Sequence, residues 1–202
     1  MAKAQIAQRG YGGTSMRDIA ESAGLLAGSL YSHFRSKAEL VRDIVVRFYD
    51  EMIPRQQAAL AAEGTGAERF RMMLDEVFAI CAPRHDELTI LHYDWHVLST
   101  LPELEEVRAK SLEVLTLWHA VIEEGKKDGS IEATLDTNAI VRIVTSSVHA
   151  LIDTVRYTDV PVTDDQGTGL AQTLNRVLLD GITTRVDGDL PRARRHQGAR
   201  QR

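Results

Sequence analysis

The sequence predicts an all-α protein, on three observations. Apolar residues recur at helical spacing over most of the 202 residues. No alternating segment is bounded by the turn residues of a hairpin. Glycine and proline gather between the periodic stretches, where helices end. The expected helices span residues 2–9, 16–23, 27–34, 37–61, 67–82, 85–99, 103–126, 137–157 and 167–186.

The composition is that of a globular protein. Hydrophobic residues make up 44% and charged residues 26% of the chain, and no apolar run approaches the roughly 20 residues that cross a bilayer. The first residues lack the apolar stretch of a signal peptide. Cys81 is the only cysteine, which excludes an internal disulfide and a cysteine-rich zinc site. We therefore expect a cytoplasmic protein with no membrane partner and no cofactor.

Charge is distributed unevenly along the chain. The net charge is −5, yet residues 1–47 carry seven basic and four acidic side chains, whereas residues 48–184 carry 11 basic and 23 acidic ones. Because a phosphate backbone responds to local charge, this pattern predicts a basic head suited to nucleic acid on an acidic body. Residues 189–202 are basic and nearly without large apolar side chains, so they are expected to form a flexible tail.

The segment after the first helix predicts two short helices joined at a glycine. Ser15 can cap the first of them, with Asp18 three residues later in a capping-box-like arrangement. Gly24 supplies the left-handed conformation that a tight turn requires. The second helix turns Leu30 and Phe34 inward, which leaves small and hydrogen-bonding side chains on its outer face.

That outer face suits the major groove of DNA. Small residues can approach base edges, namely Ala27, Gly28 and Ser29. Polar and cationic residues suit phosphates, namely Tyr31, His33 and Lys37. A plain helical hairpin inside a bundle would produce the same spacing, so spacing alone leaves both interpretations open.

The residues from Gly10-Tyr11 through Thr14-Ser-Met-Arg-Asp-Ile-Ala20 to Leu30-Tyr-Ser-His-Phe-Arg-Ser-Lys37 decide between them. They resemble the DNA-binding domain of the TetR family of bacterial repressors, over nearly all of the first 47 residues. The resemblance implies that Thr14 and Ser15 contact phosphate and that the helix from Ala27 enters the major groove. It also implies that three side chains anchor the domain to the DNA backbone: Tyr31, His33 and Lys37.

The sequence departs from the family pattern at two places. Family members carry an arm before the first helix, whereas this chain opens almost inside that helix, with Ile6 at a usually aromatic position. Leu25 and Leu26 stand where polar residues are common, so base readout would depend on Ser29 and on DNA shape. The variant G-L-L-A-G-S-L-Y-S-H-F is similar to the branch that controls steroid and fatty-acyl catabolism.

Two late helices are expected to form a homodimer. Residues 137–157 and 167–186 carry wide apolar stripes with small residues inset. Such stripes could equally be core. The family resemblance implies that these helices pair with their symmetry mates as a four-helix bundle.

A ligand pocket is expected around residues 85–98, the segment richest in polar aromatic groups. Methionine suits an adaptable pocket, although tryptophan, methionine and phenylalanine at helical spacing are also ordinary core residues. The candidate ligand-binding residues are Met73, Phe78, His92, Trp95, His96, Trp118 and His149.

An alternative is a helical metal-dependent enzyme. His92 and His96 have the i, i+4 spacing of metal ligands, with Asp94 between them. Asp94 would point to the opposite face, and no glutamate follows His92 as the metalloprotease pattern requires. No nucleophile–base pair or phosphate loop is visible in the sequence. We therefore do not expect an enzyme.

The sequence as a whole predicts a helix-turn-helix domain at 1–47, a ligand-binding and dimerisation domain at 48–188, and the tail. The expected function is that of a repressor bound to an inverted-repeat operator in double-stranded DNA. A bulky, partly apolar effector would release it by favouring a dimer with the wrong half-site spacing. The branch similarity suggests an acyl or steroid coenzyme A thioester. An activator is the open alternative.

Overall fold

The computed structural model describes residues 1–157, 172–173, 175–179 and 181–183, with the side chains of 149–157 excepted. The regular elements among these residues are helices, and the isolated bridge between Ile131 and Thr183 is the strand-like feature among them. The all-α prediction is confirmed. The elements are α1 (Ala2–Arg9), α2 (Met16–Ser22), α3 (Ala27–His33), α4 (Lys37–Leu60), α5 (Gly66–Cys81), α6 (His85–Tyr93), α7 (Trp95–Leu98), η1 (Pro102–Leu104), α8 (Glu105–Asp128) and α9 (Thr137–Tyr157).

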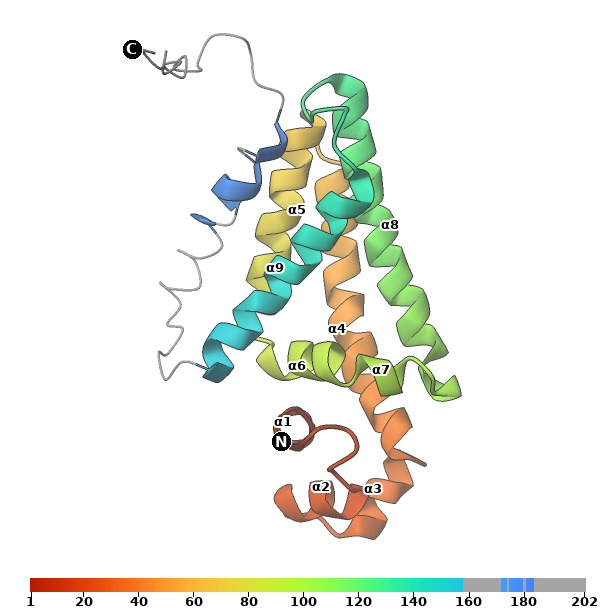
Figure 1. The fold of residues 1–202 in the computed structure, drawn as a ribbon. Coiled ribbons are helices and arrows are strands. Elements are labelled where there is room, and N and C mark those ends of the chain that lie inside the picture. The colour runs from red at the N-terminus through yellow and green to blue at the C-terminus, as the bar shows by residue number, and fades with distance from the viewer. Residues whose placement is uncertain (158–171, 174, 180, 184–202) are drawn as a thin grey trace, which may run out of the picture.

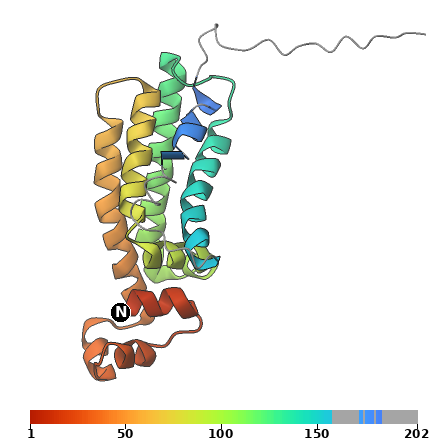
Figure 2. The ribbon, with the colours of Figure 1, turned by 90° about the vertical axis from the view of Figure 1, so that its left-hand side faces the viewer.

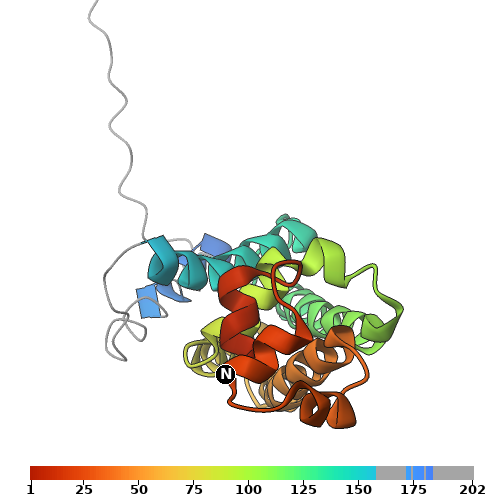
Figure 3. The ribbon, with the colours of Figure 1, turned by 90° about the horizontal axis from the view of Figure 1, so that it is seen from below.

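The helices form two parts that share α4. Helices α1 to α3 make a small head, and α4 rises from it into a bundle with α5, α8 and α9 (Figure 1). Helices α6 and α7 lie across the lower end of this bundle, facing α1 (Figures 1 and 2). Viewed from below, the head lies under the bundle rather than beside it (Figure 3). No helix of the described part is long and apolar enough to cross a membrane.

The head forms as its local sequence predicts. The Ser15 hydroxyl accepts from the Asp18 amide at 3.2 Å, and Asp18 Oδ2 accepts from the Ser15 amide at 2.8 Å, which completes a capping box. Gly24 adopts φ +68° just after α2, in the left-handed region that favours glycine. Ile19 and Leu30 are buried in the head, and this packing determines which face of α3 is exposed.

Helix α4 is continuous from the head into the body. Ser36 caps it by accepting from the Glu39 amide at 3.1 Å. The helix runs through Pro54, which lies on an exposed face. The domain boundary predicted after residue 47 therefore falls inside a helix that both parts use.

The bundle is held by close helix crossings. A Cβ added at Gly66 would lie 2.2 Å from the Gly125 Cα, so α5 and α8 approach each other backbone to backbone. Near this crossing, Trp118 packs edge-on against Phe70 with ring centroids 5.4 Å apart. Asn175, in the later helical residues, donates to Asp75 on α5 at 2.6 Å.

The structure corrects two predicted helices. The helix expected at 85–99 is divided at Asp94 into α6 and α7, and the Asp94 carboxylate accepts from the Tyr11 amide of the head at 2.9 Å. The helix expected at 103–126 begins with a 3-10 turn and continues to Asp128, where Gly129 at φ +79° ends it. Of the helix expected at 167–186, residues 172–173, 175–179 and 181–182 are helical and the rest lies outside the described residues. The tail at 189–202 also lies outside them.

Candidate DNA interface and ligand cavity

The outer face of α3 is exposed as a groove-reading face requires. Leu30 is buried and points into the head, whereas Tyr31 is 53% exposed. Ala27 is half-buried at the start of the helix, and the other predicted contact residues on α3 are exposed: Gly28, Ser29, Tyr31 and His33. Leu26, just before α3, is 83% exposed. The residues predicted to face DNA on this helix are thus accessible, with Ala27 only partly so.

Two predicted phosphate-contacting residues also have partners inside the head. Thr14 is buried, and its hydroxyl donates to the Gly10 carbonyl at 3.0 Å. The Lys37 ammonium donates to the carbonyls of Tyr11 and Thr14 and lies 4.1 Å from the centroid of the Tyr11 ring. Burial lowers the pKa of Lys37, while Asp94 opposes that shift. Thr14 and Lys37 therefore fix the turn between α1 and α2.

Ser15 is exposed beside them at the start of α2. Its hydroxyl donates to Asp18 Oδ2 at 2.5 Å, and its hydrogen bonds lower the pKa of the Asp18 carboxyl. Because phosphate oxygens are acceptors, a phosphate contact requires the Ser15 hydroxyl to turn its proton from Asp18 towards the DNA.

A cavity of about 350 Å³ lies among α4, α5, α6, α7, α8 and α9. Its volume is within the range of small-molecule sites, and its wall is mainly apolar and aromatic. The wall consists of Phe48, Tyr49, Met52, Gln56, Val77, Cys81, Leu88, Leu91, His92, Trp95, Ser111, Val114, Leu115, Trp118, Val144, Thr145 and Val148.

Three of the predicted ligand-binding residues line this cavity: His92, Trp95 and Trp118. Met73 and Phe78 are buried but outside its wall, since the cavity side of α5 is made by Val77 and Cys81. His96 is exposed on α7, where its Nδ1 lies 3.1 Å from the Tyr93 carbonyl. The side chain of His149 lies outside the described residues.

The contribution of α4 to the cavity was not anticipated from the sequence. Phe48, Tyr49 and Met52 line the cavity, but in the sequence they have the helical spacing of ordinary core residues. Gln56 continues the same stripe one turn later, and it is fully buried. A glutamine in an otherwise apolar stripe is the signal that could have identified this wall.

The polar groups of the wall differ in whether they have partners. The Tyr49 hydroxyl is hydrogen-bonded to Ser111, and burial raises the pKa of Tyr49. Burial also raises the pKa of the Cys81 thiol to about 12. The Gln56 amide has no hydrogen-bond partner at Nε2 or Oε1 among the described residues.

The residues of the metal-site alternative are not brought together. His92 and His96 lie on either side of the break between α6 and α7, and the Asp94 carboxylate is bound to the Tyr11 amide. Within the described part of the chain, no group of three His, Cys, Asp or Glu side chains could hold a metal ion. The alternative of a metal-dependent enzyme finds no support here.

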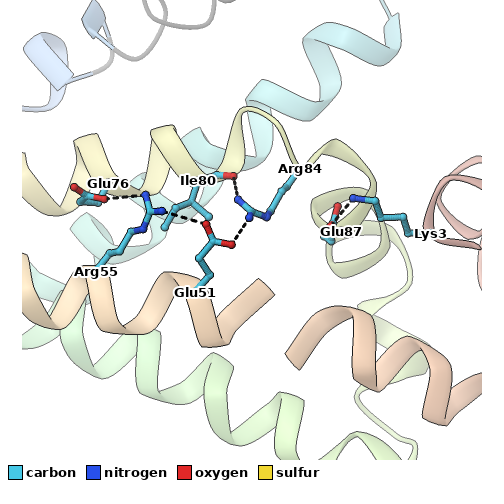
Figure 4. A network of polar contacts seen from close by, with 7 residues as sticks. All are labelled: Lys3, Glu51, Arg55, Glu76, Ile80, Arg84 and Glu87. Carbon is cyan, nitrogen blue, oxygen red and sulfur yellow. Dashed lines mark hydrogen bonds and ion pairs between the residues drawn. The ribbon is translucent and has the colours of Figure 1, made fainter. Parts of the chain in front are cut away.

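Helices α6 and α7 connect the cavity to the head. On one side, Leu91, His92 and Trp95 line the cavity. On the other, Asp94 accepts from the Tyr11 amide at 2.9 Å. The Lys3 ammonium of α1 donates to Glu87 Oε1 of α6 at 2.7 Å, and this glutamate side chain is 10% exposed (Figure 4).

The start of α6 is tied to the body by an arginine network (Figure 4). Arg84 forms an ion pair with Glu51 of α4 and donates to the Ile80 carbonyl of α5 at 3.1 Å. Arg55 reaches Glu51 at 3.2 Å and Glu76 at 3.5 Å. The same helix is therefore fixed to the body at its N-terminus and bonded to the head along its length.

Comparison with known proteins agrees with this architecture. Residues 1–44 match the family model described as bacterial regulatory proteins, tetR family, and residues 63–153 match the tetracyclin repressor-like C-terminal domain. The HTH-type transcriptional repressor KstR2 of Mycolicibacterium smegmatis is 33% identical over 144 residues, which cover 71% of this chain and 70% of that protein.

Solved structures show the same fold. The ketosteroid transcriptional regulator KstR2 of Mycobacterium tuberculosis superposes with a TM-score of 0.80 at 26% identity, covering 91% of this chain and 92% of that one. AibR, crystallised with isovaleryl coenzyme A and operator DNA, gives a TM-score of 0.73 at 20% identity, covering 88% and 94%. The helix-turn-helix head, the helical body and these matches agree: the chain belongs to the TetR family of bacterial regulatory proteins, and it is a DNA-binding transcriptional regulator rather than an enzyme.

Proposed function

We propose that this protein is a ligand-responsive repressor that leaves an inverted-repeat operator when a bulky, partly apolar molecule fills the cavity. The observation that carries the proposal is the double role of α6 and α7. These helices form part of the cavity wall and also hold the head through Asp94 and Glu87. A ligand that displaces them changes the position of the head.

The proposed division of labour follows the two parts of the fold. Residues 1–47 bind DNA, with α3 in the major groove. Ala27, Gly28 and Ser29 approach base edges. Phosphates are contacted by Thr14, Ser15, Tyr31, His33 and Lys37. Support comes from the exposure of Ser15 and of Gly28, Ser29, Tyr31 and His33 on α3. Residues 48–188 bind the effector and form the dimer.

The proposed effector is an acyl or steroid thioester of coenzyme A. Trp95, Trp118 and the apolar wall suit a bulky hydrocarbon, and His92 lies at an exposed part of the wall. The name of the M. tuberculosis relative, a ketosteroid regulator, and the isovaleryl coenzyme A bound to AibR support this class of ligand.

The proposed mechanism requires a difference in ligand affinity between two dimer geometries. Two α3 helices read successive major grooves only when they are about 34 Å apart. The effector acts by binding the geometry with the wrong spacing more tightly, because a ligand that bound both equally would shift nothing.

The test is fluorescence anisotropy with a labelled duplex taken from the DNA that flanks the protein's own gene. We expect specific binding that weakens as salt rises, and release of the duplex by acyl or steroid coenzyme A thioesters. Tighter DNA binding in the presence of the thioesters would instead indicate an activator or a co-repressor. Absence of any preference over a scrambled duplex at low salt would overturn the proposal.

A further inference from the structure

Gln56 is a buried amide in an apolar cavity. Its side chain is fully buried, and neither Nε2 nor Oε1 has a hydrogen-bond partner among the described residues. Most buried polar groups in proteins do have such partners, so an unsatisfied amide needs an explanation. A primary amide offers two donors and two acceptor lone pairs at one position.

Neighbouring polar groups of the wall are already satisfied. The Tyr49 hydroxyl is bonded to Ser111. The Thr145 hydroxyl donates towards the Val141 and Arg142 carbonyls of its own helix, at 3.0 and 3.1 Å. A polar group that enters the cavity at this depth therefore finds its unsatisfied hydrogen-bonding partner in the Gln56 amide.

The position of Gln56 assigns it to one end of a bound molecule. Phe48, Met52 and Gln56 stand one turn apart on α4, which spans about 12 Å from the first to the last. Helix α6, with the exposed His92, crosses the lower part of the bundle, whereas α4 continues upward past it (Figure 1). A molecule that lies along α4 with one end near His92 places its other, buried end at Gln56.

We propose that Gln56 binds an oxygen function, a hydroxyl or a ketone, on the apolar portion of the effector. The effector is then an oxygenated hydrocarbon rather than a plain saturated chain. A plain chain would leave both polar atoms of the amide unpaired, as they are in the ligand-free protein, so it would gain no hydrogen bond at this position. A hydroxyl both donates and accepts, and a ketone accepts from Nε2. The inference rests on the proposed function, since it places the effector in this cavity.

Calorimetry with matched ligands tests the proposal on the full chain. The probes are dodecanoyl coenzyme A, its ω-hydroxy derivative and its penultimate-keto derivative, each also as the free acid. We expect the wild-type protein to bind at least one oxygenated probe about tenfold more tightly than the plain chain. Gln56→Met should remove this preference, because methionine fills a similar volume without hydrogen-bonding groups. Met52→Leu, one turn away in the same wall, should retain it.

Thermal unfolding of the ligand-free protein gives a second readout. Gln56→Met should unfold at a higher temperature than the wild type, because it removes an unsatisfied buried amide. A lower unfolding temperature than that of the Met52→Leu control would mean that the amide has a structural role, and it would overturn the proposal.

The outcomes separate this inference from the proposed function. If dodecanoyl coenzyme A releases DNA but no oxygenated probe is preferred, Gln56 does not select oxygen and the proposed function stands. If only the free acids bind, with a preference that Gln56→Met removes, the thioester assignment is wrong and the role of Gln56 stands. Binding of none of the probes overturns the role of Gln56 and the acyl thioester assignment, while the DNA-binding test of the proposed function stands apart from it.

Discussion

The Lys37 ammonium is shared between the protein and any phosphate it contacts. It donates to two carbonyls, from Tyr11 and Thr14, which leaves one of its three N–H groups. The family resemblance implies that Lys37 anchors DNA, and nothing in the spacing of the motif indicates its internal role. The internal role and the DNA-anchoring role of Lys37 concern the same part of the head, because the turn that Lys37 fixes is next to the capped start of α2.

A comparison of two substitutions separates these roles. Lys37→Met should lower the unfolding temperature and weaken DNA binding together, since it leaves two carbonyls of the turn without their donor. Tyr31→Phe, at an exposed side chain, should weaken DNA binding on every sequence and leave the unfolding temperature unchanged. Circular dichroism melts and anisotropy titrations measure the two effects. An unchanged melt of Lys37→Met would contradict the internal role.

The Cys81 thiol makes stability depend on alkaline pH. Its folded-state pKa is raised to about 12 from an ordinary value of 9.0, so between these values the unfolded chain loses a proton that the folded protein keeps. Below about pH 9 both states keep this proton, so Cys81 adds no pH dependence to the free energy of unfolding. Between about pH 9 and 12 the free energy of unfolding should fall as pH rises. Urea unfolding at a series of pH values measures it, and Cys81→Ala should make the slope shallower. Equal slopes for both proteins would show that folding does not raise the pKa of Cys81.

At the scale of elements, the segment formed by α6 and α7 lines the cavity and also contacts the head. The Asp94 carboxylate, which lies between two lining residues, is the acceptor for an amide in the head. Local sequence cannot reveal this contact, because its two partners lie 83 residues apart. By contrast, the capping box at Ser15 and the turn at Gly24 were predictable, since their partners are within a few residues.

Asp94→Ala should uncouple the two sites. The variant should bind the duplex and the effector, each with nearly wild-type affinity, while the effector releases DNA less effectively. Coupling free energies are typically about 1–3 kcal/mol, so the loss corresponds to a severalfold smaller shift in DNA affinity. His96→Ala, on α7 but outside the cavity wall and away from the head, is the control. Full release of DNA from Asp94→Ala by the effector would exclude this route of transmission.

The crossing of α5 and α8 tolerates no side chain at Gly66. A Cβ there would lie 2.2 Å from the backbone of Gly125, and a backbone atom cannot turn aside as a flexible side chain can. Gly66→Ala should therefore destabilise the protein by about 2–3 kcal/mol in urea unfolding. Gly12→Ala, where nothing lies within 4 Å of the added atom, should have little effect. Similar values for the two variants would show that the helices can separate without loss.

At the scale of the whole molecule, part of the cavity was predictable and part was not. Histidine and tryptophan in residues 85–98 carried a signal, and His92 and Trp95 do line the cavity. Met73 and Phe78 carried none that distinguishes a cavity wall from solid core, because both environments favour the same apolar side chains. Which of these faces an empty volume depends on how six helices pack together.

The assembly of two chains gives a prediction at the same scale. Ile143 on α9 is 52% exposed, and Val177 in the later helical residues is 63% exposed, on the segments expected to form the dimer. Ile143→Glu should convert the dimer to a monomer and lower operator affinity, because a single head contacts one half-site. Light scattering after size-exclusion chromatography measures the mass. Leu112→Glu, at an equally apolar and exposed position of α8, should remain dimeric. A monomeric Leu112→Glu would place the interface on α8.

The continuity of α4 restricts how this chain can change in length. One helix of 24 residues belongs to the head at its start and to the cavity wall further along. An insertion or deletion of a single residue between these parts would turn the head by about 100° relative to the cavity and shift it by about 1.5 Å. Such a change would turn the recognition face away from its half-site while both parts stayed folded. Exchange of heads between relatives must therefore conserve the number of residues in α4, however different the sequences are.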